Sequence, residues 1–491
     1  MIEIDGSSLG IDDIVAVARR RTPVRVGEEA RERVRRSQVF ANAASSERPV
    51  YGRTTGVGAN RVLTVADPEL GARGLILSHA TSGGSLRSAE RVRAMLVVRL
   101  NQLAADGNGA SPDLLDALAD LLQLDALPPV RELGSIGTGD LSALAVTALA
   151  ISGQVETTNP IRRPVVVGSG DALPFLSSNA ATLADAALAL ADLVELAEAT
   201  HVVAALTFAG VTGNIEAFAP AVEVVTPFPG ARQVCVRMRE LVAGAPTGAR
   251  IQDPFGLRSL PQVQGVFLDS LAILAGVVTP MVNTGSENPI VSATHGVAHH
   301  GGFHASYLAQ SLDAVVLAAS QSAHLSLARL TMLAEPAYTG LAPFLGDGTP
   351  AASGIMILKY VVASALAEMR TLASPASLQS VTLSRGVEED ASFASLAASQ
   401  AAQTAIRLRT VLAGELVAAV RCLRLRARPG AARATLPAGL DAALATLPAG
   451  LHAAWAAVGN LPGNVEDRDL TADLEMAERL LNRLAGTDPE G

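Results

Sequence analysis

Hydrophobic residues recur at three- and four-residue spacing over long stretches of this chain, which is the spacing of one face of an α-helix. In the segment 389–426 the recurring positions are Phe393, Ala397, Ala401, Ala405, Leu408, Leu412, Leu416, Ala419 and Leu423. Similar patterns predict long helices over the segments 179–209, 261–278, 306–333 and 354–373. Helices of this length are typical of a bundle, so we expect a mainly α protein.

Shorter elements are predicted before the first long helix. Residues 1–50 carry short helical patterns that break at Thr22-Pro23. Further helices are predicted over 70–124, with an interruption at 105–109. The run Val165-Val166-Val167 suits a short strand.

These patterns predict three parts in sequence order. Residues 1–200 form an N-terminal helical domain that carries the glycine-rich loops described below, and residues 201–427 form a central bundle of long helices. Residues 428–491 form a short helical appendage, in which the sequence Thr-Leu-Pro-Ala-Gly-Leu occurs at 435–440 and again at 446–451. Two copies are too few for a repeat fold, and we assign no chemistry to this part.

Composition narrows the class of protein. The chain is 49% hydrophobic but only 3% aromatic, so its core must consist of Ala, Leu and Val, two of which are strong helix formers. We find no run of 18 predominantly apolar residues, so we expect no membrane span. The N-terminus is acidic, so we expect no signal peptide. The net charge of −9 argues against nucleic acid as a partner. Two distant cysteines without metal-ligand spacing fit a reduced, cytoplasmic protein without a metal site.

A tyrosine precedes closely spaced glycines in the segment Tyr51-Gly-Arg-Thr-Thr-Gly-Val-Gly58. The segment lacks the Gly-Lys-Ser/Thr ending of a phosphate-binding loop, so we do not expect nucleotide binding. Glycines supply hinges, and a tyrosine on a hinged loop suits a lid that carries a general base. An ordinary flexible turn is the alternative. A phenol titrates near about pH 10 in isolation, so a base at neutral pH needs electropositive surroundings.

Two further segments carry candidate chemistry. The loop Gly134-Ser-Ile-Gly-Thr-Gly-Asp-Leu141 leads into an apolar helix over 141–152, and its simplest interpretation is a helix start capped by Asp140. The segment Gln252-Asp-Pro-Phe-Gly-Leu-Arg258 ends in an arginine that suits a carboxylate clamp, with a structural ion pair as the alternative.

In order and spacing, these segments resemble the aromatic amino acid ammonia-lyases and aminomutases, and the histidine ammonia-lyases in particular. The Tyr-Gly-x-x-Thr-Gly-x-Gly loop of that family is matched at 51–58, and its Asn-Pro segment is matched at Asn288-Pro289. Its Gly-Ser-x-Gly-Ala-Ser-Gly-Asp-Leu and Gln-Asp-x-Tyr-Ser-x-Arg segments are approximated at 134–141 and 252–258. Its Gly-Asn-Phe-His and Gln-Glu-Asp segments correspond to 301–304 and 388–390.

The resemblance implies a fold of long central helices assembled as a homotetramer, with active sites shared between subunits. It implies a small-molecule substrate, an amino acid or related carboxylate, and no diffusible cofactor. In the family an Ala-Ser-Gly tripeptide cyclises and loses two waters to form an electrophile, the methylidene-imidazolone (MIO) group. The implied catalytic residues are Tyr51 as base, the MIO-like tripeptide Gly137, Thr138 and Gly139, and Glu389 near the substrate amine. The implied substrate-binding residues are Ser78, His79, Ser177, Gln252, Phe255, Arg258, Asn288 and Phe303.

The sequence departs from the family pattern around the electrophile. The tripeptide segment is one residue short, with Thr138 supplying the hydroxyl that dehydration needs. The family's asparagine that polarises the MIO carbonyl corresponds to Ser177, with Asn179 two residues along, and Phe255 replaces a tyrosine. Three alternatives stay open: a lyase or aminomutase with a standard or Thr-derived electrophile, an MIO-independent lyase or isomerase, and a non-catalytic homologue.

Overall fold

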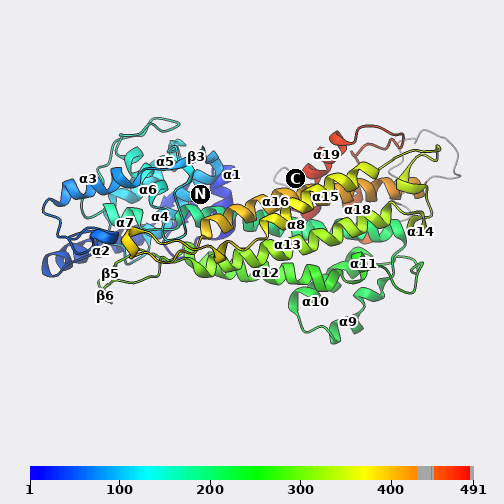
Figure 1. Ribbon diagram of the computed structural model, residues 1–491, viewed down its shortest axis with the longest axis horizontal. Coiled ribbons are helices and arrows are strands. Elements are labelled where there is room, and N and C mark those ends of the chain that lie inside the picture. Colours follow the sequence, from blue (N-terminus) through cyan, green and yellow to red (C-terminus); the bar gives the residue numbers. More distant parts are fainter. Residues whose placement is uncertain (428–443, 445–446, 487–491) are drawn as a thin grey trace. The chain divides into compact units, whose positions relative to one another are not determined.

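The computed structural model of the protein describes residues 1–427, 444 and 447–486 (Figure 1). Its described residues are mainly α-helical, as the hydrophobic spacing predicts. The first copy of the repeated hexapeptide and residues 428–443, 445–446 and 487–491 of the predicted appendage lie outside the described residues.

Contacts within the chain divide it into two compact units, each assembled from three separate segments. Unit 1 comprises Met1–Ala191, Leu274–Asp313 and Pro375–Ala402, and unit 2 comprises Asp192–Ile273, Ala314–Ser374 and Gln403–Gly491. The predicted domains follow sequence order, whereas these units combine distant segments, so the three-part division stays a prediction.

The described part of unit 1 holds helices α1 to α7 and three small two-stranded sheets. Its core includes α4, which is buried along nearly its whole length, and a fully buried ion pair between Arg99 and Glu287 at 2.8 Å. The first sheet is parallel, with Ile2 opposite Val24. The elements are β1 (Ile2–Ile4), α1 (Ile11–Arg20), β2 (Val24–Val26), α2 (Glu28–Glu47), α3 (Pro68–His79), β3 (Gly83–Leu86), α4 (Ala89–Ala104), α5 (Asp113–Leu124), β4 (Arg131–Leu133), α6 (Leu141–Ile151), α7 (Ala172–Leu176), β5 (Ile290–Ser292) and β6 (Gly296–Ala298).

Five long helices of the described residues contribute to the bundle of unit 2. They are α8 (Ala180–Val211), α12 (Leu260–Val282), α13 (Ser306–Leu333), α15 (Met356–Leu372) and α16 (Ala394–Arg426). Four of them, α8, α12, α13 and α16, have one end in segments of unit 1. The shorter helices are α9 (Pro220–Val224), α10 (Pro229–Leu241), α11 (Phe255–Arg258), α14 (Pro336–Thr339), α18 (His452–Ala457) and α19 (Thr471–Ala485).

Polar side chains connect the long helices inside unit 2. Gln264 of α12 donates to the Ala197 carbonyl of α8 at 3.1 Å, and Ser322 of α13 donates to Gln264. Arg329 of α13 and Glu415 of α16 form an ion pair in which both side chains are fully buried. The bundle is therefore held in register by specific buried bonds as well as by apolar contact.

Three local predictions are wrong. Helix α16 begins at Ala394 instead of 389, because Leu383 and Glu388 pair as an antiparallel bridge and Phe393 adopts a left-handed backbone with φ of 51°. Residues Val165–Val167 do not form a strand, and the short strands β1 and β2 lack a clear sequence pattern. The third wrong prediction is that the chain has no run of 18 predominantly apolar residues, because α12 contains such a run and is long and apolar enough to cross a membrane; the same length and composition also fit a helix of a bundle.

Candidate functional site

The loop that follows α2 carries Tyr51. The phenol oxygen of Tyr51 accepts a hydrogen bond from the backbone N–H of Gly58 at 2.7 Å, so the loop folds back on its own tyrosine. Arg53 anchors the loop, because its buried guanidinium donates to the Gly109 carbonyl at 2.6 Å. Gly52 has a φ of +69°, and a Cβ there would lie 2.0 Å from Leu173, so this turn requires glycine.

Opposing influences act on the ionisation of Tyr51. Burial raises the pKa of this phenol above its ordinary value, and the nearby Glu388 carboxylate raises the pKa further. The Gly58 N–H and the Arg61 guanidinium act in the opposite direction, because both stabilise a phenolate. Within this chain the net direction is upward, so the electropositive surroundings expected from the sequence are only partly present.

The loop at 134–140 forms a tight turn before α6. Gly137 and Gly139 have φ values of 85° and 122°, and both are buried, whereas Thr138 between them is half-buried. In the described part of the chain, the Thr138 hydroxyl and the Gly139 N–H make no hydrogen bond.

Asp140 closes this turn in a way that the sequence does not predict. Its carboxylate does not cap α6; it accepts from the backbone N–H and the hydroxyl of Thr182, in the first turn of α8, at 2.7 and 2.8 Å. Burial raises the pKa of Asp140, while bonds from Ser135 and Thr182 and the charge of Arg87 offset part of that rise. The turn is thereby fixed to the start of a second helix.

Two chain segments contact both the Tyr51 loop and the Gly137 turn. In the first segment, His299 Nε2 accepts from the Tyr51 N–H at 3.2 Å, and six residues later the Ala305 N–H donates to the Gly137 carbonyl at 3.3 Å. The His299 and Tyr51 rings meet edge to face.

The second segment runs from Ser384 to Ser395. The Ser384 hydroxyl accepts from the Ala59 N–H at 2.9 Å, and the Ser392 hydroxyl donates to the Gly137 carbonyl at 2.9 Å. The two segments also approach each other where His304 Nε2 lies 3.4 Å from an Asp390 carboxylate oxygen. The fold therefore brings the loop of Tyr51 and the turn of Thr138 to the same two segments.

Ser177, Asn288 and Phe303 lie around the same part of unit 1. The Ser177 hydroxyl accepts from the Asn288 N–H at 3.2 Å, and the Asn288 side chain accepts from the His300 N–H at 2.9 Å. Asn179 is buried and donates its amide to the Phe303 carbonyl at 2.6 Å. The amide oxygen of Asn179 is buried without a hydrogen-bond partner among the described residues.

The other predicted residues of unit 1 make no bond to the turn or to Tyr51 in the described part of the chain. Ser78 and His79 end α3, where His79 Nδ1 lies 2.8 Å from the Leu75 carbonyl and 3.0 Å from the Ser78 hydroxyl. Glu389 is exposed.

Gln252, Phe255 and Arg258 belong to unit 2 and form a cluster of their own. Arg258 donates to the side-chain oxygen of Gln252 at 2.8 Å and to the Asp253 carbonyl at 3.1 Å. Its guanidinium lies 4.7 Å from the centre of the Phe255 ring, which is largely exposed. Arg258 makes no ion pair among the described residues, unlike the structural arginine considered as the alternative.

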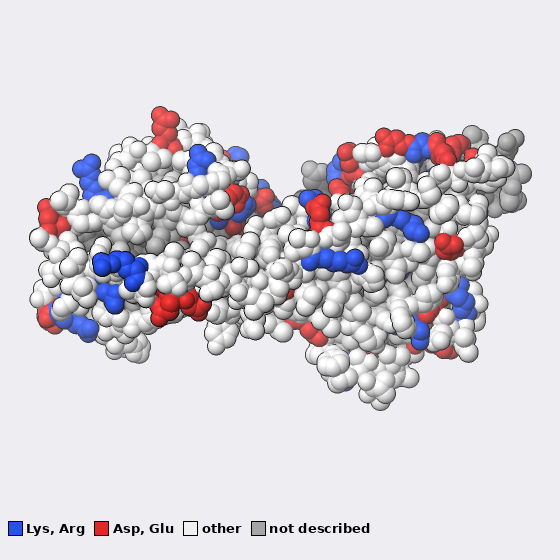
Figure 2. All heavy atoms as spheres, in the orientation of Figure 1, with Lys and Arg blue, Asp and Glu red and all other residues white. Residues whose placement is uncertain are grey.

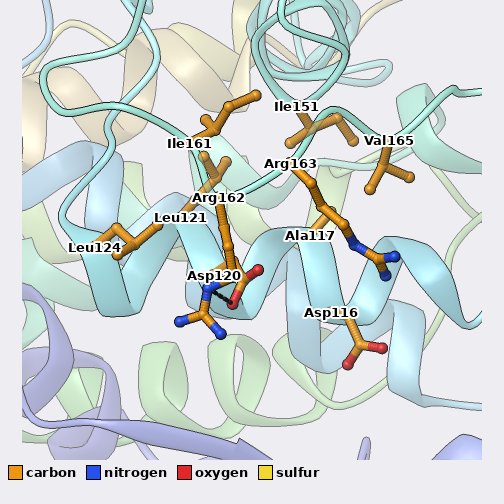
Figure 3. Close-up of a pocket in the computed structure, with 10 residues that line it drawn as sticks. All are labelled: Asp116, Ala117, Asp120, Leu121, Leu124, Ile151, Ile161, Arg162, Arg163 and Val165. Atoms are coloured by element: carbon orange, nitrogen blue, oxygen red, sulfur yellow. Dashed lines mark ion pairs between the residues drawn. The ribbon is translucent and has the colours of Figure 1, made fainter.

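A shallow pocket lies elsewhere in unit 1, between α5 and the segment 151–165 (Figure 3). Its polar lining comes from Asp116, Asp120, Arg162 and Arg163, and Arg162 lies 3.6 Å from Asp120. None of the predicted site residues lines it, so we do not assign it to the candidate site.

The sequence patterns do not single out His299 and Ser392, although both contact the site. His299 directly precedes the His300-Gly-Gly-Phe segment, and an unusual pair of histidines there is a signal that could have been used. Ser392 sits in the turn that the helical pattern wrongly includes in a helix, so its position depends on the tertiary structure.

Comparison with known proteins agrees with these observations. The model of the aromatic amino acid lyase family matches residues 9–447. The chain is 32% identical to a histidine ammonia-lyase of Anaeromyxobacter dehalogenans (strain 2CP-C), over 98% of each protein.

Solved structures share the fold. An ergothionase from Treponema denticola matches with a TM-score of 0.88 and 24% identity, over 98% of this chain and 99% of that chain. A tyrosine aminomutase from Streptomyces globisporus matches with a TM-score of 0.89 and 24% identity, over 98% of this chain and 97% of that chain. The family model and the sequence identity over the full length together establish that the chain belongs to the aromatic amino acid lyase family of carbon–nitrogen lyases.

Proposed function

We propose that this protein catalyses a non-oxidative elimination from an α-amino acid, or the related 2,3-amino shift, with Tyr51 as the base. The single observation that carries the proposal is the 2.7 Å bond from the Gly58 N–H to the Tyr51 phenol oxygen. This donor offsets part of the rise in the pKa of Tyr51 that burial and Glu388 cause, because it stabilises the phenolate, which is the form that removes a proton from carbon. The loop glycines allow the tyrosine to approach and leave a bound substrate.

Arg258 is the proposed anchor of the substrate carboxylate. A planar guanidinium binds a carboxylate through two parallel hydrogen bonds, and Arg258 has no carboxylate partner among the described residues. Gln252 holds one of its nitrogens in place, and the Phe255 ring stacks on the charge. The exposure of this cluster fits a residue set that completes a site with another subunit.

We propose a homotetramer, as the family resemblance implies. Apolar side chains are exposed along the long helices of unit 2, namely Val266, Ile273, Leu317, Ile357, Tyr360 and Ile406. The face in Figure 2 has large areas without charged side chains, which suits burial between subunits. Multi-angle light scattering should give four times the 50.3 kDa mass of the chain. Both cysteines are free and buried, which fits the proposed cytoplasmic location.

The substrate is proposed to be an amino acid or related carboxylate with a polar side chain. Ser78 and His79 favour an imidazole or similar group: His79 Nδ1 lies 2.8 Å from the Leu75 carbonyl, which leaves its Nε2 for a polar group of the substrate. Asn288 and Phe303 would line the pocket, and Glu389 would contact the amine. The curated relative is named a histidine ammonia-lyase, which is consistent with this class.

The tripeptide Gly137-Thr138-Gly139 fits an autocatalytic group of the MIO type. Ring closure requires the Gly139 nitrogen to attack the Gly137 carbonyl. The Gly139 N–H is free within the described chain, and the Gly137 carbonyl accepts two hydrogen bonds that polarise it. The Thr138 hydroxyl has no hydrogen-bond partner among the described residues, which fits a group that is later eliminated. The formed group would supply an electrophile that increases the acidity of the substrate C–H.

An MIO-independent elimination on the same scaffold is the second candidate. It is favoured by the surroundings of the turn, because the Asn179 amide donates to Phe303 and the Ser177 hydroxyl accepts from Asn288. Phe255 also lacks the hydroxyl of the family's tyrosine. A substrate with a more acidic C–H would need only Tyr51 and Arg258.

The experiment that tests the proposal is a screen of α-amino acids for release of ammonia and for ultraviolet absorbance of an unsaturated product. Tyr51→Phe should abolish turnover, and Tyr307→Phe, which alters a largely exposed tyrosine of α13, should not. Thr138→Ala separates the candidates, because it abolishes turnover only if the electrophile is needed. Full turnover by Tyr51→Phe would refute the assignment of the base, and no turnover by the wild type on any substrate would favour a non-catalytic homologue.

A further inference from the structure

The turn before α6 is fixed through three successive backbone carbonyls. The Ser135 carbonyl accepts from the Ser395 hydroxyl at 2.8 Å, and the Ile136 carbonyl accepts from the Phe393 N–H at 2.8 Å. The Gly137 carbonyl accepts twice, from the Ser392 hydroxyl at 2.9 Å and from the Ala305 N–H at 3.3 Å. Only the third carbonyl therefore has two donors.

These donors come from the beginnings of two long helices. Phe393 directly precedes α16 (Ala394–Arg426), and Ala305 directly precedes α13 (Ser306–Leu333). The N-terminus of a helix presents unpaired N–H groups and a partial positive charge. Negative charge that develops on the Gly137 oxygen would therefore be stabilised by both helices as well as by the Ser392 hydroxyl.

Ser392 and Gly137 are complementary in shape. Ser392 is 4% exposed, and a Cβ added at position 137 would lie 2.1 Å from its Oγ. The Ser392 hydroxyl therefore reaches the turn through the space that an alanine side chain at position 137 would occupy. This chain has glycine at that position, which allows the hydroxyl to bond the carbonyl directly.

We infer that the Ser392 hydroxyl and the Ala305 N–H form an oxyanion-binding pair that promotes closure of the Gly137-Thr138-Gly139 ring. The inference rests on the proposed function and deepens it by naming a positioning residue for maturation of the electrophile. The Gly139 nitrogen bonds to the Gly137 carbonyl carbon, and the negative charge on the carbonyl oxygen is held by the two donors. That oxygen takes up one proton from the Gly139 nitrogen and one from the Thr138 nitrogen and leaves as water, while a double bond forms between the Thr138 nitrogen and the Gly137 carbonyl carbon.

The second water comes from Thr138. Its hydroxyl leaves with the proton of its Cα, which creates a double bond between Cα and Cβ with one methyl group on Cβ. The chain loses two water molecules in total, and no oxidant or reductant is required. Removal of one donor from an oxyanion site slows the reaction that it serves by about 100- to 1,000-fold.

The test measures maturation by mass, independently of turnover. Chains produced by cell-free synthesis are sampled over time, and the peptide containing residues 130–150 is weighed. The wild-type peptide should become lighter by two waters, Ser392→Ala should do so about 100- to 1,000-fold more slowly, and Ser392→Thr, which keeps a hydroxyl, should recover most of the rate. The control Ser395→Ala removes a bond to the neighbouring Ser135 carbonyl only and should mature normally.

Several outcomes would overturn the inference. An unmodified wild-type peptide would exclude the ring. Comparing the turnover of Tyr51→Phe with that of the wild type would still test separately whether the protein catalyses the elimination. Equal maturation rates in Ser392→Ala and the wild type would exclude Ser392. If Ser395→Ala slowed maturation as much as Ser392→Ala, or if a folded Ser392→Thr did not mature, the inference would be wrong. The bonds would then serve only to hold the turn in place and not to stabilise charge on the Gly137 oxygen. Circular dichroism checks that each variant is folded.

Discussion

Glu415→Gln replaces a fully buried carboxylate by an amide of nearly the same size inside the bundle of unit 2. The carboxylate accepts from Arg329 at 2.6 and 2.8 Å, from Thr207 at 2.7 Å and from Ser326 at 2.6 Å, so both of its oxygens are fully used. Arg329 also donates to the Gly256 carbonyl at 3.2 Å. The substitution would leave the Arg329 charge buried without a counter-ion. It would also place an amide N–H₂, which cannot accept hydrogen bonds, against side chains that donate to the carboxylate.

The size of the effect follows from burial. Removing one partner of a buried ion pair costs about 3–5 kcal/mol, because the remaining charge stays desolvated. The matched control is Glu368→Gln, which breaks an ion pair with Arg407 between the neighbouring helices α15 and α16. Those two side chains are 55% and 41% exposed, so we expect a loss below about 1 kcal/mol.

The assay is urea unfolding at a fixed protein concentration, followed by fluorescence of Trp455. This is the only tryptophan of the chain, and it is buried in unit 2, so its emission reports on the correct unit. The double substitution Arg329→Met with Glu415→Leu removes both charges and should regain most of the lost stability. Equal midpoints for Glu415→Gln and Glu368→Gln would refute the reasoning, as would a double variant less stable than Glu415→Gln.

Three further predictions follow from the site. Glu388→Gln removes a charge that raises the pKa of Tyr51, so the rise of kcat/KM with pH should move to lower pH. Arg61→Gln removes a charge that lowers this pKa, so the same rise should move to higher pH. If the pH–rate profiles of both variants shifted in the same direction relative to the wild type, this reasoning would be contradicted. Gly137→Ala should destabilise the fold by about 1–3 kcal/mol in urea unfolding, since a φ of +85° is strained for alanine and the new Cβ would meet Ser392. The peptide of this variant that contains residues 130–150 should also keep its unmodified mass. Arg258→Lys should raise KM by about tenfold or more with a smaller change in kcat, because a lysine cannot make two parallel bonds to a carboxylate; an unchanged KM would argue against Arg258 as the carboxylate anchor.

The long helices could be predicted closely from the sequence, because their apolar spacing persists over many turns. Helix α13 has the predicted bounds Ser306–Leu333, and α8 and α12 differ from prediction by a few residues. The start of α16 could not be predicted, since Phe393 and Ser392 leave the helix to bond the carbonyls of a turn more than 250 residues earlier. Local periodicity carries no information about such a distant partner.

The candidate site could be predicted in its residue types but only partly in its arrangement. Motif spacing predicts Tyr51, Thr138 and Arg258 as site residues, whereas the contacts of His299 and Ser384 became visible only in three dimensions. The bonds of Asp140 illustrate the reason, because its place before α6 suggested a cap whereas its carboxylate serves α8. Each of these contacts depends on how helices pack, which a short sequence motif does not encode.

The bond between Ser392 and Gly137 joins residues 255 positions apart, and this separation has a consequence for biosynthesis. A ribosome adds about 5–20 residues per second, so the turn leaves the ribosome roughly 10 to 50 seconds before its anchors are made. The start of α13 at Ala305 is made earlier, but for the whole of that interval the nascent turn lacks the bonds from Ser392 and Phe393 before α16. Any chemistry that depends on the anchored turn therefore has to wait until nearly the whole chain has been synthesised, which would protect incomplete chains from carrying a reactive group.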